Sequence, residues 1–213
     1  MAVSHTIIPL RQGRIAGAEN YLVPDVEKRA RRCPVAAFDD KAVIEFLRRS
    51  YFAVDGLWFV RVEDEHSYGE AMRLDEQVWE IMPKIQARKA RQLLKIQTGS
   101  LADLALALWL RFAAEGCEYR VIERTPDVLR IEILTCPWLD GLRKSGRMEI
   151  APDVCERICT IDYSGWAAEF SKDIEFSFEC KLSEGAPGCI MRFARTCESE
   201  EQPHPDEKRE AAG

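Results

Sequence analysis

Cysteines are the residues in this sequence whose type and spacing could do chemistry. Five of the eight lie within residues 136–189. Residues 174–182 alternate apolar and polar side chains, which predicts a half-buried strand with Cys180 on its apolar side. A second strand carrying Cys189 follows, and a turn centred on residues 184–185 would place Cys180 directly opposite Cys189. Two thiols would then face the same core from adjacent strands.

A helix upstream of these strands should carry two more thiols. Pro152 suits the first turn of a helix, and Cys155 and Cys159 follow four residues apart on one helix face. Both lie near the helix N-terminus, where the helix dipole lowers the pKa of a thiol. Cys136 opens another short helical segment after a strand that ends near Leu134. The predicted elements therefore gather thiols from two helices and two strands.

Three interpretations of these thiols compete. Free cysteines are often small buried apolar residues with no further role. A tetrahedral thiolate site would instead hold zinc, or iron as the alternative, with Cys136, Cys155, Cys180 and Cys189 as ligands. A disulfide between Cys180 and Cys189 ranks lowest, because nothing else points to an oxidising compartment. The metal site is our working hypothesis.

Length and composition are those of a globular protein. The chain has 213 residues, of which 46% are hydrophobic and 31% charged, enough for one sizeable domain or two small ones. A net charge of −6 provides no basic field for nucleic acid, and no apolar run is long enough to cross a membrane. The N-terminus lacks the hydrophobic region of a signal peptide. We therefore expect a cytoplasmic protein with reduced thiols and without nucleic-acid or membrane partners.

Residues 38–116 predict a layer of helices. The first helix should be capped by Asp39-Asp40, present an apolar face as far as about Phe52, and end at Asp55-Gly56. The aromatic and apolar residues 57–62 fit either a short strand or the start of the next helix.

Two further helical segments complete this layer. The helical pattern over residues 68–94 should be kinked or split at Pro83. Ser100 and Asp103 form a capping-box pair that starts a helix, and Gly116 should end it. This third helix is apolar nearly all round, so it should be central and buried.

The second half of the chain has a different pattern. Two strands within residues 118–134 read as a hairpin, and the cysteine-bearing helices and the second hairpin follow. The fold class is therefore α+β, with an N-terminal helical layer followed by a β-β-α-α-β-β antiparallel sheet domain over residues 117–196. Residues 38–196 should form one compact unit. Residues 1–37 read as a flexible basic arm and residues 197–213 as a disordered tail.

Several stretches resemble known families. FSFECKLSEGAPGCIMRF and the helix DVCERICTIDYSGWAAEF resemble the vinyl-four-reductase domain family. DGLWFVRVEDEHSYGEAMRLDEQVWEIMPKIQARK resembles the helical signature of prokaryotic proteins named after L-2-amino-thiazoline-4-carboxylic acid hydrolase. The resemblance covers residues from about 38 to 195. It implies a helical layer followed by a ligand-holding domain, a homodimer, and binding of a small molecule and zinc.

The resemblance also implies a zinc ligand set. Mapped onto this sequence, that set is Cys155, Glu175, Cys180 and Cys189. Glu175 is five residues from Cys180, so an undistorted strand puts it on the opposite face, whereas a bulge would change that. Cys136 is the fourth ligand that strand parity favours, and Glu175 and Cys159 remain alternatives.

Other candidate residues are few. Only three histidines occur, and two of them lie in the predicted arm and tail, which argues against a Ser-His-Asp triad or a histidine-rich zinc site. No phosphate-binding glycine motif occurs. His66 is the only histidine candidate for proton transfer, and Cys159 is the candidate nucleophile. Trp138 and Trp166 flank the cysteines and should lie beside a ligand pocket. Tyr163 and its neighbour Asp162 could orient a ligand there, although helix packing explains both equally well.

Three functions remain open. The first is a ring-opening hydrolase acting on C–N or C–S bonds of a small heterocycle, which the resemblance implies and which needs a thiolate or a metal-bound water. The second is a non-catalytic sensor or carrier of a small molecule with structural zinc. The third is a metal or cofactor delivery protein in which the thiolates are the working site. All three share a small-molecule or metal site in the α+β domain.

Overall fold

The computed structural model describes residues 38–196. The predicted arm 1–37 and tail 197–213 lie outside the described residues. Contacts group the chain into two units, one ending at Phe46 and the other beginning at Leu47, so the boundary falls inside the first helix and not before it. Everything that concerns the site belongs to the second unit. Within the described range, no helix combines the length and apolarity needed to span a membrane.

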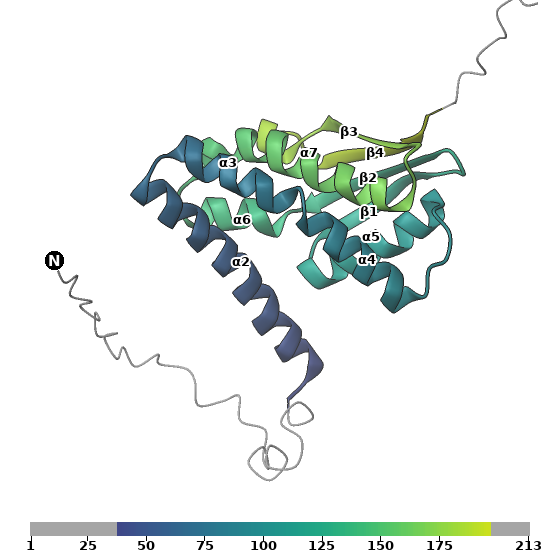
Figure 1. The fold of residues 1–213 in the computed structure, drawn as a ribbon, viewed down its shortest axis with the longest axis horizontal. Helices are drawn as coiled ribbons and strands as arrows, with labels where there is room; N and C mark the ends of the chain where they lie inside the picture. The colour runs from purple at the N-terminus through teal and green to yellow at the C-terminus, as the bar shows by residue number, and fades with distance from the viewer. Residues whose placement is uncertain (1–37, 197–213) are drawn as a thin grey trace, which may run out of the picture. The chain divides into compact units, whose positions relative to one another are not determined.

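Helices come first and strands follow, which confirms the α+β class and the predicted order of elements (Figure 1). The helical part consists of α2 (Asp40–Glu65), α3 (Tyr68–Trp79), α4 (Met82–Leu94) and α5 (Leu101–Glu115). The rest consists of β1 (Glu118–Arg124), β2 (Val128–Thr135), α6 (Pro137–Lys144), the 3-10 turn Met148–Ile150, α7 (Ala151–Phe170), β3 (Ile174–Cys180), the 3-10 turn Leu182–Glu184 and β4 (Cys189–Arg195).

Local signals set most helix ends. The Ser100 hydroxyl accepts from the backbone N–H of Asp103 and the Asp103 carboxylate accepts in return, which confirms the capping box. Gly116 ends α5 at φ 78°, a left-handed conformation that glycine adopts without strain. The pattern over 68–94 is split between α3 and α4, with Pro83 in the first turn of α4 where a missing N–H is tolerated.

The end predicted for the first helix is wrong. Asp55-Gly56 does not stop it, and α2 continues through residues 57–62 to Glu65. A glycine inside a helix costs only about 1 kcal/mol, and Phe59 and Val60 beyond it are half-buried against the rest of the unit. Phe59 packs edge-on against Tyr68 at 6.0 Å between ring centroids. Burial of this second half of α2 outweighs the local break signal.

The strands form one antiparallel sheet in the order β1-β2-β4-β3. The β3–β4 register follows the prediction as far as Phe178, which lies opposite Met191. It then shifts, so Cys180 lies opposite Ile190, and the predicted pairing of Cys180 with Cys189 is wrong. The reason is the shape of the turn, which is a 3-10 turn closed by Gly185 and not a tight hairpin. Beside this turn the strand pairing skips one residue of β3, and the register shifts.

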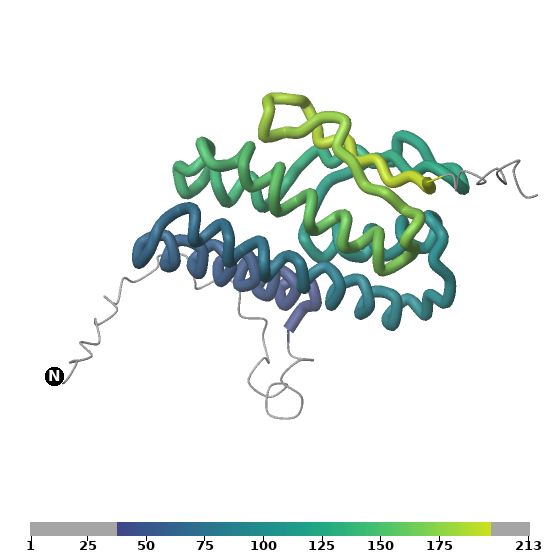
Figure 2. The backbone as a smooth tube through the Cα atoms, turned by 45° about the horizontal axis from the view of Figure 1, so that its top comes forward, coloured from purple at the N-terminus to yellow at the C-terminus, as the bar shows by residue number. Residues whose placement is uncertain are grey.

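The main core lies between the sheet and the helices that cover it. Figure 2 shows α7 in green between the strands and the blue helices α3 and α4, and α7 packs against β3, α3 and α4. Phe112 and Leu108 of α5 and Trp166 of α7 are fully or almost fully buried against Leu129 and Phe193 of the sheet. A second cluster, built on Met72, Trp79 and Ile158, joins α3 to α7. This second cluster borders the cavities described below.

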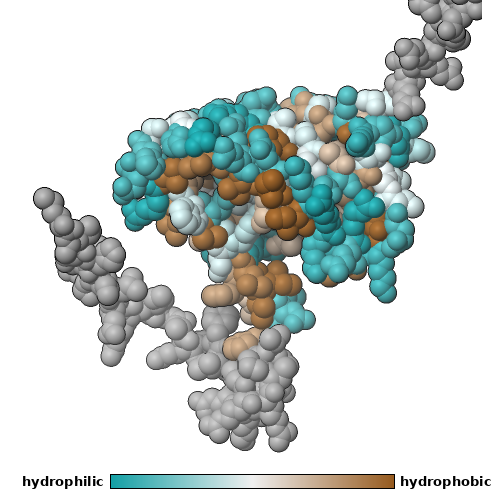
Figure 3. Space-filling model, in the orientation of Figure 1, coloured by the Kyte–Doolittle hydropathy of each residue, from teal (hydrophilic) through white to brown (hydrophobic). Residues whose placement is uncertain are grey.

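Apolar surface remains on the helices. Exposed large hydrophobic residues of the second unit include Val54, Leu57, Trp58, Val78 and Ile85. Figure 3 shows hydrophobic side chains in brown gathered over this helical part of the molecule. Surfaces of this kind are typical of protein interfaces. The homodimer implied by the sequence resemblance stays a prediction.

Candidate functional site

Two adjoining cavities lie among the helices of the second unit. The larger has a volume of about 520 Å³ and is walled mainly by α2 and α6 and the start of α7. The smaller, about 90 Å³, lies deeper against α3, α5 and α7. They share five lining residues, Asp55, Asp75, Trp138, Leu142 and Val154. The two cavities therefore form one site with an apolar outer chamber and a narrower inner end.

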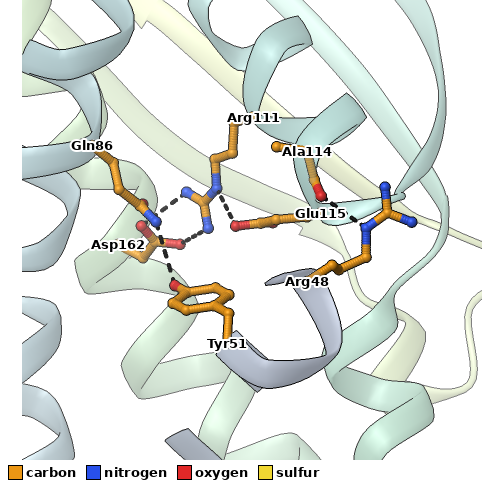
Figure 4. Close-up of polar contacts among 7 residues, drawn as sticks. All are labelled: Arg48, Tyr51, Gln86, Arg111, Ala114, Glu115 and Asp162. Atoms are coloured by element: carbon orange, nitrogen blue, oxygen red, sulfur yellow. Dashed lines mark hydrogen bonds and ion pairs between the residues drawn. The ribbon is translucent and has the colours of Figure 1, made fainter. Parts of the chain in front are cut away.

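The inner end carries a buried network of charges around Arg111 (Figure 4). The guanidinium donates to both carboxylate oxygens of Asp162, at 2.9 Å and 2.5 Å, and its Nε donates to Glu115 at 3.0 Å. All three side chains are at most 7% exposed. The rings of Tyr163 and Trp166 face the guanidinium at 4.9 Å and 5.4 Å, so this cation is enclosed by carboxylates and aromatic faces.

Burial and ion pairing oppose each other in this network, and burial raises the pKa of Asp162 despite the nearby charge of Arg111. Burial alone would lower the pKa of Arg111, but Asp162 and Glu115 outweigh burial and hold that pKa well above its ordinary value. Burial raises the pKa of Glu115, and the charges of Arg111 and Arg48 oppose that rise. Nearby, the Gln86 amide donates to the Tyr51 hydroxyl at 3.3 Å, while the buried Oε1 of Gln86 has no partner within the described part of the chain.

Two further carboxylates line both cavities, and no cation of residues 38–196 lies beside them. Burial raises the pKa of Asp55 from 3.8 to about 6. Burial also raises the pKa of Asp75 to about 7, with the charges of Asp55 and Glu76 acting in the same direction and the side-chain hydrogen bond from Trp79 opposing them. The ring of Trp138 lies edge-on to Trp79 at 5.6 Å between centroids, so aromatic faces border these acids.

The predicted metal ligands lie near one another but do not converge. Cys136 and Cys155 line the inner cavity, together with Cys117 and Cys159. Cys180 and Cys189 lie outside that lining, at the β3–β4 turn. Across residues 38–196, no group of three or more Cys, His, Asp or Glu side chains is arranged to hold a metal ion. The donor type suits zinc, but the thiols as placed do not form its site.

The thiols differ in acidity. A hydrogen bond with Cys159 is the main cause that lowers the pKa of Cys155 from 9.0 to about 7, and Ser183 and Lys181 add to it against the effect of burial. Burial raises the pKa of Cys136 to about 12. At the turn, the backbone N–H of Leu182 donates to the Cys189 sulfur at 3.1 Å, and burial raises the pKa of Cys189 to about 11. Cys155 is therefore the most acidic of these three thiols.

The other candidates are placed as follows. Trp138 lines both cavities and Tyr163 lines the inner one, whereas Trp166 lies in the main core with its ring toward Arg111. His66 is exposed at the turn between α2 and α3 and lines neither cavity. Glu175 is exposed and Cys180 half-buried, in agreement with the argument from strand parity.

Sequence reasoning missed Arg111, Glu115, Asp55 and Asp75. A signal existed for the first two, because an arginine and a glutamate four residues apart interrupt the end of a helix that is otherwise apolar nearly all round. The Asp55-Gly56 pair has the pattern of a helix end, so the sequence does not indicate that Asp55 lies inside a continuous α2. Asp75 looks like any polar residue of an amphipathic helix, and only the tertiary structure places it in a cavity.

Comparisons with known proteins give a likeness in fold and a family. The fold is similar to the phenol-responsive sensory domain of the transcription activator PoxR, solved with phenol, with a TM-score of 0.51 and 13% sequence identity over 68% of this chain and 73% of that chain. At that identity the likeness shows the fold alone. No curated protein matches the chain. The family model described as a family of unknown function (DUF6125) matches residues 38–188, and the chain belongs to that family.

Proposed function

We propose that this protein is a non-catalytic binding domain for a small organic molecule, held in the two adjoining cavities. The observation that carries the proposal is the combination of a mostly apolar outer chamber of about 520 Å³ with a few polar side chains at its inner end. Ligand sites in proteins are typically chambers of roughly 300–1,000 Å³ with a small number of placed polar groups. Leu142, Val154 and Trp138 supply apolar wall, and Asp55 and Asp75 supply polar contacts.

The likeness in fold supports the proposal. The PoxR domain responds to phenol, so a chain with this arrangement of helices and strands can enclose a small aromatic molecule. Fold alone does not carry function, and the argument therefore depends on the cavities of this chain.

A hydrolase is the alternative that the sequence resemblance implies. Its candidate nucleophile, Cys159, lines the inner cavity and hydrogen-bonds with Cys155. His66, the only histidine among residues 38–196, lines neither cavity. Turnover separates the two functions, since a binding domain returns its ligand unchanged whereas a hydrolase consumes it.

The test is a screen of small aromatic amines, alcohols, phenols and carboxylates by thermal unfolding and calorimetry. We expect at least one class to raise the Tm of the wild type through binding to the folded state. Leu142→Trp, which fills the chamber, should lose this shift. Leu106→Trp is the matched control, because Leu106 is 45% exposed on α5 and lines neither cavity. No shift by any class, or an equal shift in Leu142→Trp, contradicts the proposal.

Metal binding by Cys136, Cys155, Cys180 and Cys189 remains a second proposal. The lowered pKa of Cys155 favours a thiolate at that position, and the N–H donated to the Cys189 sulfur opposes the effect of burial on that thiol. Elemental analysis of protein purified without oxygen or an affinity-tag metal should find near one zinc or iron per chain. Cys180→Ser should lose metal and stability together, while Cys117→Ser, outside the proposed set, should keep the metal. Metal-free protein with free thiols contradicts this proposal.

A further inference from the structure

We propose that the ligand of these cavities is an organic cation, an arylalkyl amine in which an ammonium group meets Asp55 and Asp75 and an aromatic ring fills the outer chamber. This inference rests on the proposed function and names the class of its ligand. It follows from the balance of charges around the cavities, from the lack of a cation beside these two acids, and from the nature of the walls.

Carboxylates outnumber cations in the lining. Four carboxylates line the two cavities, those of Asp55, Asp75, Glu115 and Asp162, against two guanidiniums, those of Arg111 and Arg147. Arg147 is paired with Glu63 at 2.6 Å, and Arg111 is shared by Asp162 and Glu115. Neither guanidinium is left for Asp55 or Asp75. A cationic ligand would correct this excess of negative charge, and an anionic ligand would increase it.

Asp55 and Asp75 come from different helices and face the same space. Asp55 lies on α2 and Asp75 on α3, and both line the inner and the outer cavity. Within residues 38–196, Asp55 has no hydrogen bond or ion pair, and Asp75 has only the N–H of Trp79. Two carboxylates without a cation in a partly desolvated site are unfavourable in the empty protein. An ammonium group has three N–H donors, so it can hydrogen-bond both acids while bringing one positive charge between them.

Aromatic side chains suit the rest of such a ligand. Trp79 and Trp138 border the acids, and Phe52 and Phe59 line the outer chamber. The Phe52 and Trp138 rings are edge-on at 4.5 Å between centroids. The Trp138 side chain lines both cavities. Aromatic faces attract a cation within about 6 Å and also pack well against an aromatic ring. The site thus offers acids for the ammonium group and apolar walls for the hydrocarbon part.

Affinity should rise with pH. An amine with a pKa of about 10 stays charged through neutrality, whereas Asp55 and Asp75 ionise near pH 6 to 7. The other charged or titratable side chains that line the two cavities are Arg111 and Glu115 of α5, Cys117 after it, Cys136 and Arg147 beside α6, and Cys155, Cys159, Asp162 and Tyr163 of α7. Glu63 and Glu76 lie next to this lining, Glu63 as the partner of Arg147 and Glu76 through its charge on Asp75.

Three compounds of similar shape test the class of ligand by calorimetry on the full chain: 2-phenylethylamine, the neutral 2-phenylethanol and the anionic phenylacetate. The amine should bind roughly tenfold or more tightly than the alcohol, and the acid should not bind. Affinity for the amine should fall between about pH 8 and about pH 5 as the two acids are protonated. Affinity for the alcohol should not follow pH.

Isosteric variants assign the effect to the two acids. Asp55→Asn and Asp75→Asn together should lower affinity for the amine roughly tenfold and leave the alcohol unchanged. Asp64→Asn is the matched control, since Asp64 lies on α2 but is exposed and outside both linings. Equal binding of amine and alcohol, or full affinity in the double variant, overturns the cation inference. If none of the three binds while another compound of the screen does, this inference fails and the proposed function stands; if nothing binds, both fail.

Discussion

Two sets of acids line the same site, one buried and one half-buried, and they differ in what accompanies them. Asp162 and Glu115 share the guanidinium of Arg111, which two aromatic rings also cover. Among residues 38–196, Asp55 and Asp75 face the cavities with no cation beside them. The first set has a cation of the fold as its hydrogen-bond partner, although one guanidinium serves two carboxylates. The second set has no such partner in the described part of the chain.

The difference indicates which set is structural and which is functional. A buried ion pair that is fully hydrogen-bonded holds its elements in one arrangement, and here it joins α5 to α7 across 51 residues of sequence. Unpaired acids in a cavity give no such benefit to the empty fold. A chain that retains them at the expense of stability is expected to use them for something else, and binding a cation is the use that their position favours.

Arg111→Met should have the largest effect on stability. It leaves Asp162 and Glu115 buried without their partner, which should lower the free energy of unfolding by about 3–5 kcal/mol. Arg88→Met is the matched control, because Arg88 makes the same two-pronged contact with Glu169 at 2.7 Å but is 69% exposed. That control should lose much less stability, because solvent screens an exposed ion pair. Urea unfolding of both variants checks the difference, and similar losses would show that burial does not distinguish the two pairs.

The sequence predicted the elements that depend on neighbouring residues. The capping box at Ser100, the break at Pro83 and the end of α5 at Gly116 are each set within a few residues, and all three are confirmed. The order of strands and helices followed from the same kind of local pattern. Fold class was therefore accessible without any tertiary information.

Features that depend on distant residues were not accessible. The Asp55-Gly56 signal failed because tertiary burial beyond it carries α2 onward. The register at Cys180 shifted because the turn is a 3-10 turn whose shape the alternation of residues does not encode. Arg111 and Asp162 meet across two helices, so neither local periodicity nor spacing reveals the pair. The cysteines attracted attention by type, whereas the charged groups of the site are common residues in uncommon surroundings.

Asp75→Asn should have a smaller effect, of opposite sign to that of Arg111→Met. The folded protein holds the pKa of Asp75 at about 7, above its ordinary 3.8, so folding favours the protonated form. Between about pH 4 and 7 the folded state binds more protons than the unfolded state, and the free energy of unfolding falls as pH rises through this window. Asparagine removes that loss and still accepts from the Trp79 N–H. Allowing for partial solvent screening, we expect a gain of roughly 1–2 kcal/mol near pH 8.

The pH dependence of this gain separates a charge effect from a packing effect. Near pH 4 Asp75 is protonated in the folded wild type and partly so in the unfolded chain, so the two proteins should differ much less in stability there than near pH 8. The charge of Asp55 is one cause of the raised Asp75 pKa, so the repulsion between the two acids is part of the charge effect and also disappears at low pH, where both are protonated. Asp64→Asn, on the exposed part of α2, should change stability little at either pH. If the gain in stability of Asp75→Asn persists unchanged near pH 4, or if the variant is less stable than the wild type near pH 8, then Asp75 is not an unpaired charge in the folded protein. The contrast with the Arg111 network would then disappear, and with it the electrostatic argument for a cationic ligand.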